Sequence, residues 1–259
     1  MKREKTNYII QSVNHALDIL EEFCKQQEEL GVTELSKRLN LHKNNVFRLL
    51  ATLESRGYIE QNKATENYCL GVKNLELGQA FIKQIGLLRL ARPVLNDLER
   101  DTNETCYIAV ARGNSVFYLD AVETKQIVKV ASRVGSRLPI FTTSVGKVLV
   151  ASEPIEEIEK MIPKAGLTKF TDHTITDKKK LIEHLKVVAQ KGYAVDYEEF
   201  DLGVACTAAP IRDYTRRVVG AVSLSGPSSR LSMDRLEKEL VPMVLEAAKE
   251  ISRRLGYVE

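Results

Sequence analysis

The apolar residues of the first seventy positions recur at helical spacing in three blocks. The first block starts at Val13, where Ser12 is placed to cap the helix, and Thr33 is placed to cap the second. The third block predicts a helix from about His42 to Arg56 whose packed face holds Val46, Leu49, Leu50 and Leu53. Because only the short turn at Asn40-Leu41 separates the second helix from the third, the pair predicts a helix-turn-helix.

Two short runs after the third helix predict a β-hairpin. Gly57-Tyr58-Ile59-Glu60 and Tyr68-Cys69-Leu70 are separated by the turn residues from Asn62 to Asn67. A hairpin that follows a helix-turn-helix is the wing of a winged helix. A three-helix scaffold with a solvated polar face also fits the pattern, but the order and spacing of the parts favour the winged helix.

The polar face of the third helix carries the chemistry of a DNA-reading surface. At about 100° per residue, the positions opposite the packed face are Asn44, Arg48, Ala51 and Ser55, with Asn45 and Thr52 beside them. Asparagine bonds adenine and arginine bonds guanine through paired hydrogen bonds, and a lysine near the helix start reaches a phosphate. The candidate DNA contacts are therefore Thr33, Lys43, Asn44, Asn45, Arg48, Thr52 and Lys63.

An apolar stripe at helical spacing continues beyond the hairpin and predicts a linker helix. It consists of Val72, Leu75, Leu77, Phe81, Ile82, Ile85 and Leu88. Such a stripe packs either onto its own domains or onto its counterpart in a dimer. We favour the dimer, because two-fold symmetry lets two helix-turn-helix units bind half-sites about one helical turn apart.

The remainder of the chain predicts an α+β domain with a mostly antiparallel sheet, because its strands are grouped in hairpins and separated from its helices. Strands are expected at residues 105–111, 116–122, 127–131, 193–197, 204–210 and 218–225. Helices are expected at 90–100, 145–151, 155–161 and 178–190, followed by a last helix that Ser232 caps and Pro242 can kink.

Composition and charge narrow the class of protein. With 259 residues, 44% hydrophobic and 28% charged, two soluble domains are expected, and no stretch approaches the roughly 18 apolar residues of a membrane span. The four dispersed cysteines, without metal-ligand spacing or a signal peptide, indicate a reducing cytoplasm. The net charge of +3 says little, but positions 37–63 hold six basic residues against Glu54 and Glu60, a local positive region suited to phosphates.

Six segments together resemble the IclR family of transcriptional regulators in order and spacing. In the N-terminal part these are residues 12–20, Thr33-Glu34-Leu35, and residues 46–53 with Gly57-Tyr58-Ile59. In the C-terminal part they are residues 137–140 with 144–147, residues 192–199 continuing to 206–211, and residues 220–227. Two departures from the family pattern stand out. Asn44-Asn45 replaces the family's common Ser-Thr pair, which affects the operator sequence that is preferred. Thr207 and Arg212 replace the usual apolar and aromatic residues, so the ligand of the family cannot simply be carried over.

The resemblance implies a winged helix-turn-helix at 9–71, a linker helix at 72–91 and an effector-binding domain at 92–259 with a GAF-like sheet. It implies a transcriptional repressor, a homodimer or tetramer, whose binding to a double-stranded DNA operator is modulated by a small acidic metabolite. Carried over by position, the effector residues are Val130, Leu138, Ser144, Val145, Asp196, Val204, Cys206, Ser223 and Ser225. An apolar wall with a few converging polar groups is the usual composition of such a site.

Other functions remain open from the sequence. Cys206 could be a nucleophile, but no histidine accompanies it in a known pattern. Asp196 with Glu199 could orient a ligand, bind a metal or cap a turn, and Ser223 and Ser225 point to one face, which is either a pocket or solvent. A metabolite sensor or enzyme whose winged helix contacts a protein is the alternative. We expect no enzyme activity, cofactor, metal or membrane contact.

Overall fold

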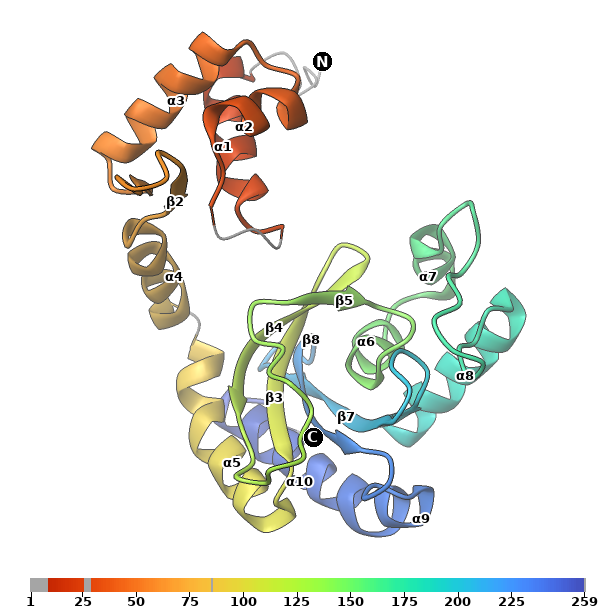
Figure 1. The fold of residues 1–259 in the computed structure, drawn as a ribbon. Helices are drawn as coiled ribbons and strands as arrows, with labels where there is room; N and C mark the ends of the chain where they lie inside the picture. The colour runs from red at the N-terminus through yellow and green to blue at the C-terminus, as the bar shows by residue number, and fades with distance from the viewer. Residues whose placement is uncertain (1–8, 26–28, 85, 259) are drawn as a thin grey trace. The chain divides into compact units, whose positions relative to one another are not determined.

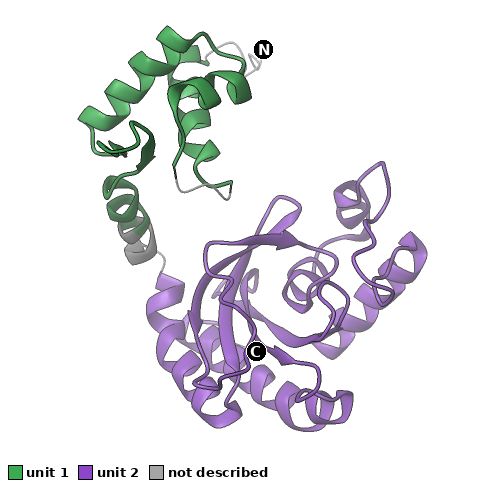
Figure 2. Cartoon of the chain, in the orientation of Figure 1, with its two compact units in different colours: residues 1–84 green, residues 85–259 purple. Residues whose placement is uncertain are grey.

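The computed structural model describes residues 9–25, 29–84 and 86–258, and it divides into two compact units. The first unit covers residues 1–84 and the second covers residues 85–259 (Figure 2). Each unit has its own hydrophobic core.

The N-terminal unit is a three-helix bundle followed by a hairpin and a fourth helix. Its elements are α1 (Gln11–Glu22), α2 (Val32–Leu39), α3 (Lys43–Ser55), β1 (Ile59–Gln61), β2 (Tyr68–Leu70) and α4 (Lys73–Gln84). The fully buried side chains Ile19, Leu35, Val46, Leu50 and Ile59 form its centre. The strands β1 and β2 pair in antiparallel register, so the predicted winged helix-turn-helix is confirmed.

The caps predicted for the first two helices are wrong. Helix α1 starts before Ser12 and α2 starts at Val32, before Thr33, and neither helix has a side-chain cap. For α2 the reason is tertiary: the backbone of Leu30 exchanges two hydrogen bonds with Tyr68 of the hairpin, at 2.9 and 3.0 Å. This pairing holds the chain extended, and the helix begins directly after it.

The C-terminal unit is an antiparallel six-stranded sheet covered by helices on both faces (Figure 1). In chain order its elements are α5 (Gly86–Thr102), β3 (Thr105–Arg112), β4 (Ser115–Val122), β5 (Arg137–Pro139), α6 (Ser144–Val150), α7 (Ile155–Met161), α8 (Lys178–Lys191), β6 (Ala194–Tyr197), β7 (Val204–Arg212), β8 (Val218–Pro227), α9 (Met233–Arg235) and α10 (Val241–Arg254). The strand order is β5-β4-β3-β8-β7-β6, with every neighbouring pair antiparallel. The predicted fold class is therefore confirmed.

Alternation along the strands divides the sheet into two faces. Cys106, Ile108, Val222 and Leu224 belong to the core under α5 and α10. Residues one position away, such as Tyr107 and Ala221, belong to a second core with α6 and α8. Figure 1 shows α6 within the curve of the sheet and α5 beside α10 on the outside.

One expectation for this unit fails. Residues 127–131 form no strand, and Ile127 is 99% exposed; the strand beside β4 is instead β5, which starts at Arg137. The expected linker segment is helical on both sides of Ile85, in α4 and α5, and because Ile85 lies outside the described residues, a continuous linker helix stays a prediction. Leu88 is buried in the core of the C-terminal unit, whereas Leu75 is exposed. The side chains of Phe81, Ile82 and Ile85 lie outside the described residues.

The last helix departs from α-geometry at its start. Ser232 caps α9 as expected, since its hydroxyl accepts a hydrogen bond from the backbone N–H of Arg235 at 3.3 Å. A π-helical turn then spans Leu236–Leu240, directly before Pro242 in the first turn of α10. Proline cannot donate a backbone hydrogen bond, so the wider turn lies where the α-helical ladder is interrupted.

Candidate functional site

Helix α3 presents the predicted DNA-contacting side chains to solvent. Its packed face consists of Val46, Leu50 and Leu53, and the imidazole of His42 accepts a hydrogen bond from the backbone N–H of Asn44 at 3.3 Å, which caps the helix. The seven predicted DNA contacts are all exposed: Thr33, Lys43, Asn44, Asn45, Arg48, Thr52 and Lys63. The face of α3 opposite the core is therefore accessible to a DNA groove. The role of these seven residues in DNA binding stays a prediction.

The wing that carries Lys63 is anchored at its tip. The carboxylate of Glu29 accepts hydrogen bonds from Asn62 at 2.6 Å and from Thr65 at 2.7 Å. These hydrogen bonds lower the pKa of Glu29, so the tie holds in the ionised form. The Lys63 side chain therefore extends from a defined turn.

Two groups of apolar side chains are exposed in the N-terminal unit, and the second belongs to the stripe for which the sequence analysis favoured a dimer contact. On α1 and just before it these are Ile10, Val13 and Leu17, and on α4 and just before it they are Val72, Leu75 and Leu77. Phe47 on α3 is also 56% exposed, on the flank of the polar face. Exposed apolar stripes of this kind mark contact surfaces.

In the C-terminal unit, register brings distant polar residues into one row. Asp196 of β6 pairs with Cys206 of β7, which pairs with Ser225 of β8. Ser223 lies two residues from Ser225 and so points to the same face, the one that α6 covers. Over this row lies a small cavity, named here the sheet cavity, lined by Tyr118, Arg133, Leu138, Thr143, Ser144, Asp196, Phe200, Asp201, Val204, Cys206, Ser223 and Ser225.

Seven of the nine predicted effector residues line the sheet cavity: Leu138, Ser144, Asp196, Val204, Cys206, Ser223 and Ser225. The other two do not. Val145 is the next residue along α6 after Ser144 and packs into the core between that helix and the sheet. Val130 is buried in the irregular segment after β4, outside the lining.

The sequence analysis missed five lining residues, among them an ion pair. Tyr118 and Thr143 come from β4 and the residue before α6, Arg133 comes from the irregular segment between β4 and β5, and Phe200 and Asp201 follow β6. Arg133 Nη2 donates to Asp201 Oδ2 at 2.5 Å, and its guanidinium lies 5.7 Å from the ring centre of Phe200. Four of these residues lie outside helices and strands, so no periodic pattern indicates them. Only for Tyr118 could the alternation along its strand have indicated the face of the sheet to which it points.

The acidic groups at this end of the sheet are strongly perturbed. Burial, and then the charge of Glu199, raises the pKa of Asp196 to about 7, while the backbone N–H of Glu199 donates to Asp196 at 2.9 Å. Glu199 forms a buried ion pair with Lys147 of α6, and burial raises the Glu199 pKa. Burial and the charge of Asp196 raise the pKa of the Cys206 thiol, which keeps it protonated and makes it a poor nucleophile.

Helix α6 reaches the cavity because it packs unusually close to the chain before it. A Cβ on Gly146 would lie 1.8 Å from the carbonyl oxygen of Ile140, so only glycine fits. The hydroxyl of Thr143 caps the helix by accepting from the Gly146 N–H at 3.1 Å. This cap places the buried Ser144 at the cavity wall.

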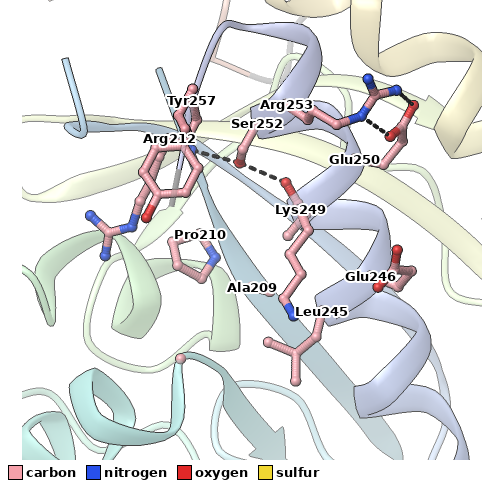
Figure 3. Close-up of a pocket in the computed structure, with 13 residues that line it drawn as sticks. Ala209, Pro210, Arg212, Leu245, Glu246, Lys249, Glu250, Ser252, Arg253 and Tyr257 are labelled. Atoms are coloured by element: carbon pink, nitrogen blue, oxygen red, sulfur yellow. Dashed lines mark hydrogen bonds and ion pairs between the residues drawn. The ribbon is translucent and has the colours of Figure 1, made fainter. Parts of the chain in front are cut away.

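A larger cavity of about 550 Å³ lies on the other side of the sheet, between β7 and α10 (Figure 3). Several of its polar groups are already paired: Arg253 pairs with Glu250 at 2.8 Å, and Ser252 accepts from the Arg212 N–H at 2.9 Å and donates to Ala248. The sheet cavity is instead lined by the buried polar residues Ser144, Asp196, Ser223 and Ser225, so we take it as the candidate ligand site.

In 9–25, 29–84 and 86–258, no group of three or more His, Cys, Asp and Glu side chains is arranged to hold a metal ion. Over the same ranges, no helix combines the length and apolar character needed to cross a membrane.

Comparisons with known proteins match both units. Residues 12–63 match the IclR helix-turn-helix domain, and residues 79–253 match the domain described as bacterial transcriptional regulator IclR C-terminal. The chain is 36% identical over 249 residues to the HTH-type transcriptional regulator XynR of Escherichia coli K12, covering 96% of this chain and 98% of that protein. It is 30% identical to the transcriptional repressor IclR of the same organism, covering 95% and 90%. The crystal structure of Thermotoga maritima IclR superposes with a TM-score of 0.77 at 30% identity, covering 95% and 99%.

Proposed function

The chain belongs to the IclR family of bacterial transcriptional regulators, and from that premise we propose that it is a dimeric repressor whose operator binding responds to a small organic acid. The observation that carries the proposal is the combination of two sites in one chain. Helix α3 exposes a row of polar side chains whose chemistry suits base edges, and the C-terminal unit holds a cavity lined by buried polar groups.

DNA recognition is assigned to α3 and the wing. Arg48 and Asn44 extend from the polar face of α3 and have the donor and acceptor geometry for base edges in the major groove. Lys43 and Lys63 flank them and would neutralise phosphates. The base contacts would supply sequence preference, and the phosphate contacts would supply salt-dependent affinity.

The exposed apolar stripes support the homodimer. Ile10, Val13 and Leu17 recur along one side of α1, and Val72 and Leu75 extend the exposed apolar surface at α4. Burying such side chains between two copies stabilises a pair, and a pair reads two half-sites at once. A second copy of the N-terminal unit is the partner that fits this arrangement.

The organic acid is assigned to the sheet cavity. Ser144, Ser223 and Ser225 offer hydroxyl donors, and Arg133 offers a positive charge. A ligand that bound there would alter the packing of α6 and of the β6–β7 connection. By linkage, any effect of the acid on operator affinity must equal the effect of the operator on acid affinity.

The test is a gel shift of the full chain against the DNA upstream of its own gene, at 50 and 200 mM salt, with unrelated DNA of the same length as control. Specific binding that survives competitor DNA, and that changes when small organic acids are added, is the expected result. If specific and unrelated DNA bind equally at both salt concentrations, the proposed DNA-binding function is wrong.

A further inference from the structure

The sheet cavity is too small to admit an organic acid without displacement of a lining group. Its volume is about 20 Å³, which is enough for a water molecule or two. A ligand must therefore move at least one side chain, and the charged groups show which one.

Arg133 is the single basic residue among those that line the cavity, and it faces two acids, Asp196 and Asp201. The pair it forms with Asp201 is asymmetric in exposure. The Arg133 side chain is 19% exposed, whereas that of Asp201 is 45% exposed. If the pair separates, the Asp201 carboxylate can be hydrated where it is, while the Arg133 guanidinium needs another anion inside the cavity.

The backbone on both sides of Asp201 is held in place. Thr171 donates to the Glu198 carbonyl at 2.6 Å, and Thr174 donates to the Glu199 carbonyl at 2.7 Å. On the other side, Val204 N–H donates to the Asp201 carbonyl at 3.3 Å, and Glu198 N–H donates to Val204 at 2.9 Å. Separation of the pair therefore requires rotation of the Asp201 side chain and no opening of the loop.

The guanidinium is fixed more firmly than its partner. Phe200 lies under it, and Phe200 itself packs against Phe170 with ring centres 4.9 Å apart. The attraction of a cation to an aromatic face does not depend on which anion pairs with it. Arg133 is thus a stationary anion receptor, and Asp201 is the replaceable anion.

We propose that the Asp201 carboxylate is an internal competitor that occupies Arg133 until the carboxylate of a small organic acid displaces it into solvent. This inference rests on the proposed function of the sheet cavity as the effector site. It makes Arg133 the residue that selects acids over neutral analogues, because a neutral ligand would separate the pair without replacing the anion.

The first test measures binding of acetate, lactate, gluconate and benzoate to the full chain by calorimetry, each beside its neutral amide. We expect wild type to prefer at least one acid over its amide, and Arg133→Gln to lose about 10- to 100-fold in affinity for that acid, as expected for a charged hydrogen bond. Arg137→Gln removes the same charge from an exposed residue of β5 outside the lining and should bind the acid as wild type does. Equal losses in the two variants would overturn the assignment, because they would reflect general electrostatics.

The second test distinguishes an Asp201 that competes with the acid for Arg133 from an Asp201 that orients Arg133 for the acid. If Asp201 competes, Asp201→Asn should bind the acid about two- to fivefold more tightly, the range expected for loss of a partly exposed ion pair. If Asp201 only orients Arg133, the variant binds less tightly or equally, and the inference is wrong. Asp201→Ser serves as a second variant should the asparagine perturb folding, as checked by circular dichroism.

Failure of the inference and failure of the proposed function give different results. If wild type binds none of the four acids at 50 mM, the inference is overturned, and the gel shift on the same preparation decides separately whether the chain is a DNA-binding regulator. If wild type binds an acid but no specific DNA, the proposed function fails while the Arg133 result stands.

Discussion

Lys147 of α6 and Glu199, just beyond β6, form an ion pair inside the C-terminal unit. The Lys147 side chain is fully buried and that of Glu199 is 11% exposed, and Lys147 Nζ also donates to the Val195 carbonyl at 3.4 Å. The pair joins the helix that carries Ser144 to the strand that carries Asp196. It thereby fixes two walls of the sheet cavity relative to each other.

Removing one partner of this pair should destabilise the chain strongly. Glu199→Gln leaves the Lys147 ammonium buried without a counterion, and we expect a loss of about 3–5 kcal/mol in the free energy of unfolding. The double variant Lys147→Met with Glu199→Leu should lose less, because no unpaired charge remains. Urea unfolding of the two proteins makes the comparison, and a double variant less stable than the single one would contradict this account.

The raised pKa of Asp196 predicts a stability that falls as pH rises. Its pKa is about 7 in the folded protein against 3.8 in the unfolded chain, so the folded state binds more protons between these values. The stabilisation is present below pH 4 and is lost as pH rises through 7, by roughly 2–4 kcal/mol. Glu199, whose pKa is also raised, acts in the same direction, and His184, whose pKa is lowered to about 4, acts in the opposite direction below 6.5.

Comparison with Asp196→Asn isolates the contribution of this one carboxyl. The asparagine keeps an oxygen that can accept from the Glu199 N–H but does not titrate. Urea unfolding between pH 4.5 and 8 should show the wild type losing stability relative to the variant. Parallel pH profiles for the two proteins would show that Asp196 is ionised in the folded state.

Arg48→Ala should weaken specific DNA binding by about 1–3 kcal/mol and relax the preference at one base, since a paired hydrogen bond is lost. Lys63→Ala on the wing should weaken binding to all DNA sequences alike. It should also reduce the salt dependence of the DNA affinity by the amount expected for about one phosphate contact. Competition gel shifts with operator and single-base variants distinguish the two effects. An unchanged sequence preference in Arg48→Ala would show that another part of α3 contacts the bases.

A charge in the exposed apolar stripe should separate the two copies. Val13→Glu and Leu75→Glu place a carboxylate on the surface assigned to the dimer while leaving the buried core of the unit intact. We expect a weaker dimer by analytical ultracentrifugation and a matching loss of operator affinity. Ser12→Glu on α1 is the control, because it adds the same charge at an exposed position that lies about 100° or more around the helix from Ile10, Val13 and Leu17. Dimerisation as strong as in wild type would place the interface elsewhere.

Helical and strand periodicity predicted most of the elements and the polar face of α3 from the sequence alone. The burial of Val46 and Leu50 and the exposure of Arg48 follow from helical periodicity, because a helix turns by a constant angle per residue. Strand alternation similarly predicted that Ser223 and Ser225 share a face. The family resemblance predicted most of the residues that line the cavity, because matching positions within helices and strands point in the same directions in related proteins.

The contacts between elements, in contrast, became visible only in the folded chain. Arg133 and Asp201 are 68 positions apart and both lie in irregular segments, so no local period indicated their contact. The start of α2 was misplaced for the same reason, because pairing of Leu30 with Tyr68 replaced the local capping preference. Periodicity shows the direction in which a side chain points from its own helix or strand. The contacts that shift pKa values and line the sheet cavity depend instead on which distant segments the fold brings together.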